Sequence, residues 1–466
     1  MGIKAAQRER LQRAVNGAVL VPGEGGYADA TRTWDLAAGS SPPVALVAAS
    51  AADISAGARW AIENDLDIAV LNTGHGALDH NAGALVINTS RVNPTAVNSS
   101  TRRAIVGPGT CWAAVSAASA PLGLTGLVGA SPGVGVIGYT LGGGLSPIGR
   151  TFGFASDRVV RMIVLDAEGR PVQVDAEDGE LFWALRGGGG LGIVTELEFE
   201  LVELSALFGG GVCFDGDDAE SVLRTYGQWV EGLDERTSTS VALIRLPDIP
   251  QLPDVLRGRF VAHLRIAHVD PRASDLESAG RRILAPMLCS GAKIDDYTTV
   301  MGPGQLPDIH RDPVAPQCVA YRGGFVDALD APTISEIAGC VGTGPEDGLR
   351  MVELRHLGGA YARSGAAPSC VTGRDAHFNL YVTTQLAQGN AADARARADG
   401  AVERITGSAR GQLNFYGPSP EPGSILRLWD FADADRILTV SKNLDPGNRI
   451  RTGHPLRLPR FTMLPW

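Results

Sequence analysis

The chain is poor in lysine and has no closely spaced cysteines. Lys4, Lys293 and Lys442 are its only lysines, no run of five or more basic residues occurs, and the formal net charge is −10. These features argue against a nucleic-acid partner. The six cysteines are scattered without a C-x-x-C pair, so neither a structural zinc site nor a disulfide framework is expected. We predict no metal site.

Long apolar runs are also missing. The N-terminal stretch 4–13 is charged and helix-like and lacks the apolar core of a signal peptide. No uninterrupted apolar run approaches the ~18 residues that a membrane span needs. We therefore predict a cytoplasmic protein with no membrane partner.

Glycine, by contrast, is abundant, with 59 among 466 residues and no low-complexity tract. Residues 1–204 alternate short strand and helix patterns, whereas 205–405 read as a second α+β unit. The segment 406–466, with a helix near 434–442, is expected to return to the first unit. The length suits two such domains.

Three glycine-rich loops, 74–76, 133–144 and 187–192, are predicted to follow strands of the first domain. Backbone N–H groups of such loops can converge on a pyrophosphate, although each loop alone could be an ordinary turn. Residues 133–138 match G-x-G-x-x-G, but a dinucleotide-binding fingerprint needs a helix that starts at the loop, and Gly142-Gly-Gly144 and Pro147 follow too closely for a helix to run. The loop 187–192 lacks the G-K-[ST] ending of a P-loop.

Five segments carry motifs in a fixed order along nearly the whole chain. They are Asn72-Thr-Gly-His75, the glycine segment 132–144 with Arg150, Leu185-Arg-Gly-Gly-Gly-Gly-Leu-Gly-Ile-Val-Thr-Glu196, Arg355-His-Leu-Gly-Gly-Ala360 and Leu444-Asp-Pro-Gly-Asn448. In this order they resemble the berberine bridge enzyme-like branch of the vanillyl-alcohol oxidase superfamily. The resemblance implies an α+β, two-domain p-cresol methylhydroxylase-type FAD-binding fold, in which helices cover the antiparallel sheet of a substrate domain.

The same resemblance implies bound FAD, linked covalently through the histidine that matches His75. The alternative is that His75 only packs beside the flavin. Many members add a cysteine link, but Ser131 stands at that position and excludes it. The residues implied to contact FAD are Asn72, Thr73, Gly74, His75, Gly76, Ser131, Val134, Gly135, Gly138, Gly142, Gly143, Gly190, Gly192, Ile193, Val194 and Asn414.

The catalytic base is the main departure from the family. Bacterial relatives carry a Tyr-x-Asn motif whose Tyr takes a proton, and the matching residues here are Gln412-Leu-Asn414. Glutamine cannot take a proton at neutral pH. The remaining candidates are Tyr416, expected on the same strand face as Asn414, then Glu353 and Arg355 on a strand facing the cleft, and more weakly Tyr139 and Tyr361. Each could instead be an ordinary sheet residue.

The resemblance implies an oxidase that takes a hydride from an alcohol or amine carbon of a small, secondary-metabolite-type substrate. Val134 matches a position where valine leaves room for oxygen, so oxygen is the expected acceptor. Three alternatives stay open: a dehydrogenase with another acceptor, a non-redox cyclisation or cycloaddition on the flavin fold, and a flavin-containing binding protein. Residues 205–405 show no charged recognition cluster in sequence, and a monomer and a homodimer are both compatible with the chain.

Overall fold

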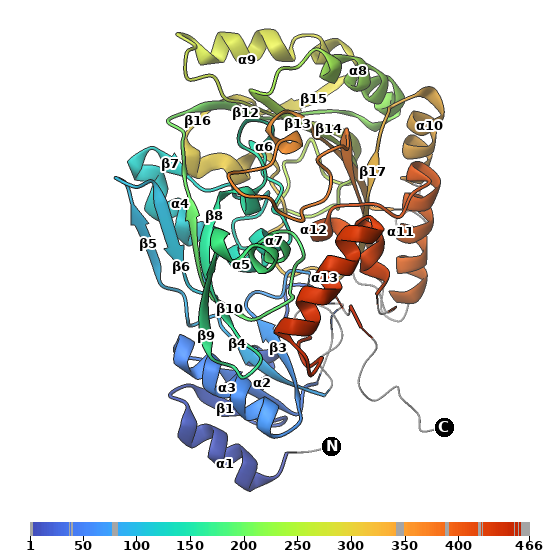
Figure 1. Cartoon of the computed structure of the whole chain (residues 1–466). Coiled ribbons are helices and arrows are strands. Elements are labelled where there is room, and N and C mark those ends of the chain that lie inside the picture. Colours follow the sequence, from blue (N-terminus) through green and yellow to red (C-terminus); the bar gives the residue numbers. More distant parts are fainter. Residues whose placement is uncertain are drawn as a thin grey trace.

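The computed structural model describes residues 3–36, 38, 41–76, 83–341, 349–386, 391–417, 421, 423–451, 453–454 and 456–457. It has the expected α+β architecture with two domains packed side by side (Figure 1). The division at 204/205 and 405/406 stays a prediction. No described helix is both long and apolar enough to cross a membrane.

The first domain contains two sheets. A mixed sheet has the order β1-β2-β4-β3, and an antiparallel sheet has the order β5-β6-β10-β8-β9. The strands are β1 (Ala18–Leu20), β2 (Val44–Val47), β3 (Asp67–Leu71), β4 (Ala84–Asn88), β5 (Thr95–Asn98), β6 (Arg103–Val106), β8 (Val159–Leu165), β9 (Pro171–Asp175) and β10 (Val194–Glu200). Short strands β7 (Leu124–Thr125) and β11 (Val202–Glu203) pair separately.

Helix α3 (Ala51–Glu63) shows why this part of the chain folds as it does. Its face with Ile54, Ala58 and Trp60 is buried in one core with strands β2 and β4, because these residues recur at helical spacing. Asp53 is the third residue of the helix. Ser50 caps the helix. Its side-chain hydroxyl, one turn before Asp53, accepts a hydrogen bond from Asp53 N and so satisfies that backbone amide.

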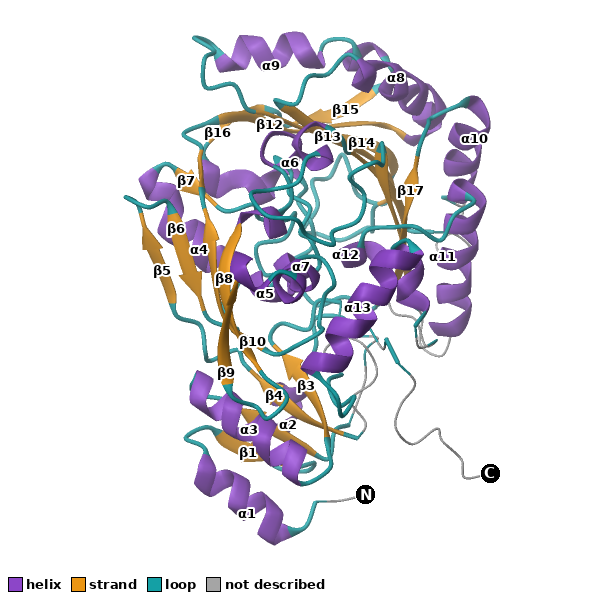
Figure 2. Ribbon diagram, viewed as in Figure 1, coloured by secondary structure: helices purple, strands orange, loops and turns teal. Residues whose placement is uncertain are grey.

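The second domain is built on an eight-stranded antiparallel sheet of described residues, with the order β15-β12-β14-β13-β18-β19-β17 and β16 beside β12. Its strands are β12 (Leu207–Asp215), β13 (Thr237–Arg245), β14 (Phe260–His268), β15 (Lys293–Asp296), β16 (Thr299–Met301), β17 (Val319–Val326), β18 (Met351–His356) and β19 (Phe378–Gln385). Figure 2 shows helices α8 (Ala219–Glu231), α9 (Leu276–Leu284), α10 (Ala331–Cys340) and α11 (Ala391–Thr406) on its outer side.

Side-chain alternation separates the two faces of this sheet. On β18, Val352 and Leu354 belong to the core shared with the helices, and Glu353 and Arg355 point to the opposite face, as the sequence predicts. That opposite face turns toward the glycine loops of the first domain. The polar residues of the sheet are therefore gathered at the domain junction.

The remaining helices are short and lie mostly around that junction. They are α1 (Ala5–Ala14), α2 (Tyr27–Thr31), α4 (Trp112–Ser119), α5 (Val136–Leu141), α6 (Gly149–Phe152), α7 (Glu180–Leu185), α12 (Leu413–Tyr416) and α13 (Phe431–Leu444). Helix α5 corrects one expectation: a helix does run inside the glycine segment, because Val136, Ile137 and Leu141 pack into the main core. It ends at Gly142 after six residues.

Arg150 joins the two domains. Its buried guanidinium donates hydrogen bonds to the carbonyl oxygens of Thr237, Leu233 and Leu357, which lie in or beside the second-domain sheet. Charge-assisted hydrogen bonds from a buried guanidinium to several backbone carbonyl oxygens stabilise the positions of the segments that carry those oxygens. The junction between the domains is therefore fixed on this side.

Candidate functional site

The His75 loop follows β3 and is held by the segment that contains Trp34. The Thr73 carbonyl accepts a hydrogen bond from Trp34 N at 2.9 Å. Gly74 has φ +73°, and a Cβ there would lie 2.5 Å from Thr33 Cα, so only glycine fits this approach. The Trp34 and His75 rings stack with centroids 4.4 Å apart. The imidazole thus has a fixed orientation.

The His75 ring is neutral and has one unpaired nitrogen. Its Nδ1 lies 2.9 Å from Thr73 Oγ1, and its buried Nε2 has no hydrogen-bond partner among the described residues. Burial lowers the pKa of His75 to about 4. At neutral pH the ring can therefore act as a nucleophile or as a hydrogen-bonding group.

The segment 131–138 lies next to this ring. The Cβ position of Gly133 is 4.0 Å from both His75 Cε1 and Ser131 Oγ, so the three predicted positions come together. Gly135 packs on Asn72, whose Nδ2 would lie 2.8 Å from a Cβ there. Gly138 is exposed on α5 with no atom within 4 Å of its Cβ position. Bare backbone beside an unpaired imidazole nitrogen fits a flat, anionic cofactor such as FAD.

Gln412 and Asn414 bind the glycine segment from the far end of the chain. Gln412 Nε2 donates to Gly142 O at 2.8 Å and to Asn414 Oδ1 at 3.0 Å, and its Oε1 accepts from Asn414 N. Asn414 Oδ1 also accepts from Gly144 N at 3.0 Å. The Gln412 amide is thus fully occupied in shaping this segment, at the position where relatives place their base.

The loop 187–192 corrects a second expectation, because it follows helix α7 and not a strand. Gly187 N and Gly189 N both donate to Leu141 O at 2.9 Å, so these amides serve packing. The side chains of Ile193 and Val194 are buried in the hydrophobic core, and Gly192 packs on Leu444. Any FAD contact of Ile193 or Val194 would therefore be made by backbone atoms. Gly190 is half-buried beside Gly453.

Three tyrosines named as candidates have hydroxyl groups directed to backbone oxygens. Tyr139 donates to Leu127 O at 3.0 Å and Tyr361 to Ser146 O at 2.7 Å. For Tyr416 the expected strand is wrong: α12 (Leu413–Tyr416) is helical, and the buried Tyr416 hydroxyl lies 3.4 Å from Ser424 O. The helical turn directs Phe415, not Tyr416, toward the sheet, where it contacts Tyr381 with ring centroids 5.1 Å apart.

Glu353 and Arg355 belong to a charged cluster that the sequence does not reveal. Glu353 Oε1 accepts from Arg265 Nη1 at 2.8 Å and from Ser240 Oγ at 2.9 Å, and its Oε2 accepts from Arg355 Nε and Nη2. His310 Nε2 lies 3.5 Å from the same carboxylate. Burial alone would raise the pKa of Glu353, but the two guanidinium groups hold it well below the usual carboxyl value. Glu353 is therefore no proton acceptor and positions the arginines instead.

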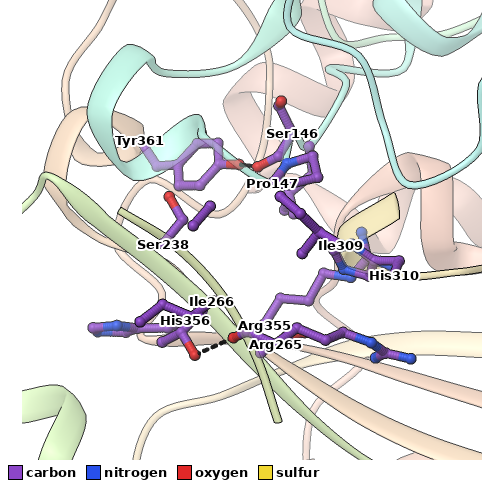
Figure 3. A pocket seen from close by; sticks show the side chains of 14 residues that line it. Ser146, Pro147, Ser238, Arg265, Ile266, Ile309, His310, Arg355, His356 and Tyr361 are labelled. Atoms are coloured by element: carbon purple, nitrogen blue, oxygen red, sulfur yellow. Dashed lines mark hydrogen bonds between the residues drawn. The ribbon is translucent and has the colours of Figure 1, made fainter. Parts of the chain in front are cut away.

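A pocket lies over this cluster, between the sheet and residues of the first domain (Figure 3). Its lining residues are Leu145, Ser146, Pro147, Ser238, Thr239, Ser240, Arg265, Ile266, Ala267, Ile309, His310, Arg355, His356 and Tyr361. The arginines line the cavity, whereas Glu353 lies behind them. Arg265 and His310 could not be found from sequence, because strand β14 and the 3-10 helix η6 (Pro303–Ile309) meet β18 only in the folded protein.

Two further phenols were missed for the same reason. Tyr321 on β17 and Tyr381 on β19 have ring centroids 5.8 Å apart, and neither hydroxyl is hydrogen-bonded to a described residue. The Cβ position of Gly76 is 3.2 Å from the Tyr321 hydroxyl, which places this phenol beside the His75 loop. Burial raises the pKa of both tyrosines. They remain protonated and can donate hydrogen bonds at the junction of loop and sheet.

Among the described residues, no group of three or more His, Cys, Asp or Glu side chains could hold a metal ion. The six cysteines are all free thiols. Nothing in the geometry therefore competes with an organic cofactor at the His75 loop.

Comparisons with known proteins find FAD-linked relatives. Residues 42–175 match the FAD binding domain family FAD_binding_4. The chain is 31% identical over 195 residues to (R)-6-hydroxynicotine oxidase of Paenarthrobacter nicotinovorans, a match that covers 41% of this chain and 43% of that protein. It is 30% identical to an FAD-linked oxidoreductase of Bacillus subtilis over 48% of this chain and 51% of that protein. The chain thus spans about half the length of the curated relatives it matches.

Solved structures show the same fold over nearly the whole chain. A crystal structure of 6-hydroxy-D-nicotine oxidase from Arthrobacter nicotinovorans has a TM-score of 0.82 at 21% identity and covers 95% of this chain and 98% of its own. A berberine bridge enzyme-like protein of Physcomitrella patens has a TM-score of 0.80 at 16% identity, with 97% and 100% covered. Glucooligosaccharide oxidase of Acremonium strictum, whose FAD is described as 6-S-cysteinyl and 8α-N1-histidyl, has a TM-score of 0.81 at 16% identity, with 97% and 100% covered.

Proposed function

Because residues 42–175 form an FAD binding domain and the whole chain has the fold of the berberine bridge enzyme-like flavoproteins, we propose that the protein is an FAD-dependent oxidase of a small molecule. The observation that carries this proposal is the neutral His75 ring, whose Nε2 has no partner among the described residues and whose Cε1 lies 4.0 Å from the Cβ position of Gly133. The free thiols of all six cysteines favour action in the cytoplasm.

Bound FAD would supply the electron acceptor for a hydride from an alcohol or amine carbon of the substrate. The chain supplies position and a dry environment: Asn72, Gly135 and Gly138 shape the cofactor side, and the β13–β18 face of the sheet lies opposite. Tyr321 and Tyr381, protonated at neutral pH, can donate hydrogen bonds to substrate oxygen or nitrogen. Molecular oxygen is the proposed final acceptor.

We further propose that His75 is covalently joined to the flavin 8α carbon. The bond replaces one ring N–H and one methyl C–H, and the two protons and two electrons released reduce oxygen to peroxide. Two features of the structure support it, the low pKa of His75, caused by burial, and the Trp34 stack that fixes the ring. Ser131, beside the same ring, leaves no thiol for a second bond.

The function is tested on the purified protein by its absorbance spectrum and by peroxide release. A yellow protein that releases peroxide with an alcohol or amine substrate supports an oxidase. A colourless protein that cannot be reconstituted with FAD would overturn it. If the substrate bleaches the flavin absorbance and an artificial acceptor restores it but oxygen does not, the protein is a dehydrogenase.

A non-redox cyclisation on the same fold remains the second candidate, and the fully hydrogen-bonded Gln412 amide favours it, since no base stands there. This candidate predicts product formation from a substrate whose oxidation state does not change. Flavin bleaching by the true substrate under nitrogen excludes it.

Gly138→Val should deplete the cofactor without weakening the protein. Helix α5 has open space at this position, so the side chain meets no protein atom, and replacing glycine by the β-branched valine inside a helix stabilises it by about 0.3 kcal/mol. We expect FAD content to fall several-fold and the melting temperature of the apoprotein to stay level or rise. Gly339→Val is the matched control, because that position is also open and helical but lies on α10 of the second domain. Full FAD content in the Gly138 variant would show that α5 does not face the cofactor.

Val134→Leu should slow the reaction of reduced flavin with oxygen. Val134 is half-buried and directly follows Gly133, the neighbour of the His75 ring, so one added methylene narrows the space beside the cofactor. We expect the reoxidation rate in stopped flow to fall about tenfold, equivalent to about 1.4 kcal/mol in the barrier. Anaerobic reduction by substrate should keep its rate. An unchanged reoxidation rate would show that Val134 does not control oxygen access.

A further inference from the structure

The cavity over the sheet carries more positive than negative charge. Arg265 and Arg355 both line it and are 3% and 7% exposed, and their shared carboxylate, Glu353, is 1% exposed and lies outside the lining. Two guanidinium groups thus face one carboxylate that is turned away from the open space. Burying a charge lowers the free energy of unfolding unless an opposite charge lies beside it. Here the opposite charge can enter only from the cavity.

The hydrogen bonds within the cluster leave donors unused. Both Glu353 oxygens are occupied by Ser240, Arg265 and Arg355. Arg265 Nε is buried without a partner, in a side chain that is more than nine-tenths buried. Buried donors without acceptors are rare in folded proteins, and such donors are often completed by a ligand.

The other titratable groups around the cavity do not cancel this charge. Burial lowers the pKa of His310 and, with Arg150 adding to it, that of His356 to about 3, so both rings are neutral at pH 7. Asp312 is the further carboxylate near Arg355, but it is half-exposed and makes no hydrogen bond to it. The remaining lining side chains are apolar, hydroxyl or phenol groups. The two lining arginines and Glu353 alone have one positive charge in excess, and Asp312 offsets part of it from its half-exposed position.

We propose that this cavity binds a carboxylate group of the substrate, so that the substrate class is a small organic acid that carries the oxidisable alcohol or amine carbon. Arg355 and Arg265 hold the carboxylate by charge-assisted hydrogen bonds, and Ser238 and Tyr361 bound the space beside it (Figure 3). The proposal rests on the proposed function only in taking the bound acid to be the substrate.

The position of Arg355 connects this anchor to the reacting region. Its guanidinium carbon lies 4.9 Å from the centre of the Phe415 ring, which contacts Tyr381, which in turn contacts Tyr321 beside the His75 loop. A carboxylate held at Arg355 would direct the rest of the molecule along these rings toward the loop. The same site would bind neutral sugars weakly, because they would leave the guanidinium donors of Arg265 and Arg355 without a charged acceptor.

The test is calorimetric titration of the flavoprotein with benzoate and with benzamide, two probes of nearly equal shape that differ in charge at pH 7. We expect benzoate to bind at least about tenfold more tightly than benzamide, equivalent to about 1.4 kcal/mol. Raising the salt concentration should weaken this preference, because part of it is electrostatic. Equal affinities of the two probes, or tighter binding of benzamide, would overturn the proposal.

Two variants assign the effect to the cluster. Arg355→Met should abolish the preference for benzoate, and Arg355→Lys should keep part of it, because lysine restores the charge but not the paired geometry. Arg363→Met removes one positive charge from an exposed pair with Glu235 and should change neither affinity. If Arg355→Met fails to fold, the preference of wild-type protein and of Arg355→Lys for benzoate over benzamide tests the proposal. A preference that survives in a folded Arg355→Met protein would contradict the assignment.

These outcomes separate the inference from the proposed function. A protein that oxidises neutral alcohols and shows no benzoate preference remains an oxidase without an acid site. A protein without FAD that still prefers benzoate keeps the acid site and loses the oxidase function.

Discussion

Replacing His75 by alanine should release all flavin on acid precipitation, whereas wild-type protein should keep its yellow colour in the pellet. Among the described side chains within 4.0 Å of the Gly133 Cβ position, the imidazole can form a carbon–nitrogen bond with the cofactor, and Ser131 replaces the second anchor. Loss of the bond should also lower the flavin reduction potential, and for a two-electron couple about 30 mV corresponds to about 1.4 kcal/mol. We therefore expect turnover to fall about tenfold or more.

The control for this variant is His377→Ala, which removes an exposed histidine of the second domain. Its pellet should stay yellow. Thr73→Ala is the informative intermediate, because it removes the hydroxyl 2.9 Å from His75 Nδ1 and should lower the covalently bound fraction without abolishing it. A wild-type pellet that is already colourless would remove the covalent bond from the proposal and leave bound FAD intact.

Replacing Glu353 by alanine should have the largest effect on stability. The carboxylate is 1% exposed and receives hydrogen bonds from two buried arginines, so its removal leaves both guanidinium groups without an anion. Breaking a buried ion pair from one side typically costs about 3–5 kcal/mol. Denaturant unfolding should show this loss. Glu235→Ala, which breaks an exposed pair with Arg363, should cost no more than about 1 kcal/mol.

The same carboxylate makes a definite contribution to the pH dependence of stability. Its pKa is lowered in the folded state, so the contribution is complete above the ordinary carboxyl value of about 4.3 and is lost as the pH falls through the folded value. Wild-type protein should therefore lose stability below about pH 4 more steeply than Glu353→Gln. Parallel pH profiles for the two proteins would show that Glu353 is not charged in the native state.

Much of the fold follows from local patterns in the sequence. Strands such as Asp67–Leu71 and helices such as Trp112–Ser119 appear where apolar periodicity predicts them. The exceptions occur where tertiary packing decides. Leu413–Tyr416 forms a helical turn because Gln412 and Asn414 bind the glycine segment, and this turn exchanges the places of Phe415 and Tyr416.

The cofactor loop was readable from sequence because its residues are consecutive. The charged cavity was not, because its four ionisable members come from β14, β18 and the end of η6, which are far apart along the chain. Arg265 and His310 each look like an ordinary polar residue in its own segment. Only the antiparallel order β14-β13-β18 places Arg265 and Arg355 on the same sheet face, separated by one strand. Ser240 on that middle strand completes the cluster.

The bonds from Gln412 and Asn414 to the glycine segment also set a sequence of events in biosynthesis. Gln412 meets Gly142 across 270 residues, so the loop 142–144 lacks its partner while the ribosome is still making the second domain. Translation yields about 5–20 residues per second, which leaves this interval open for tens of seconds. A chain released before residue 414 therefore lacks the residues that close this segment.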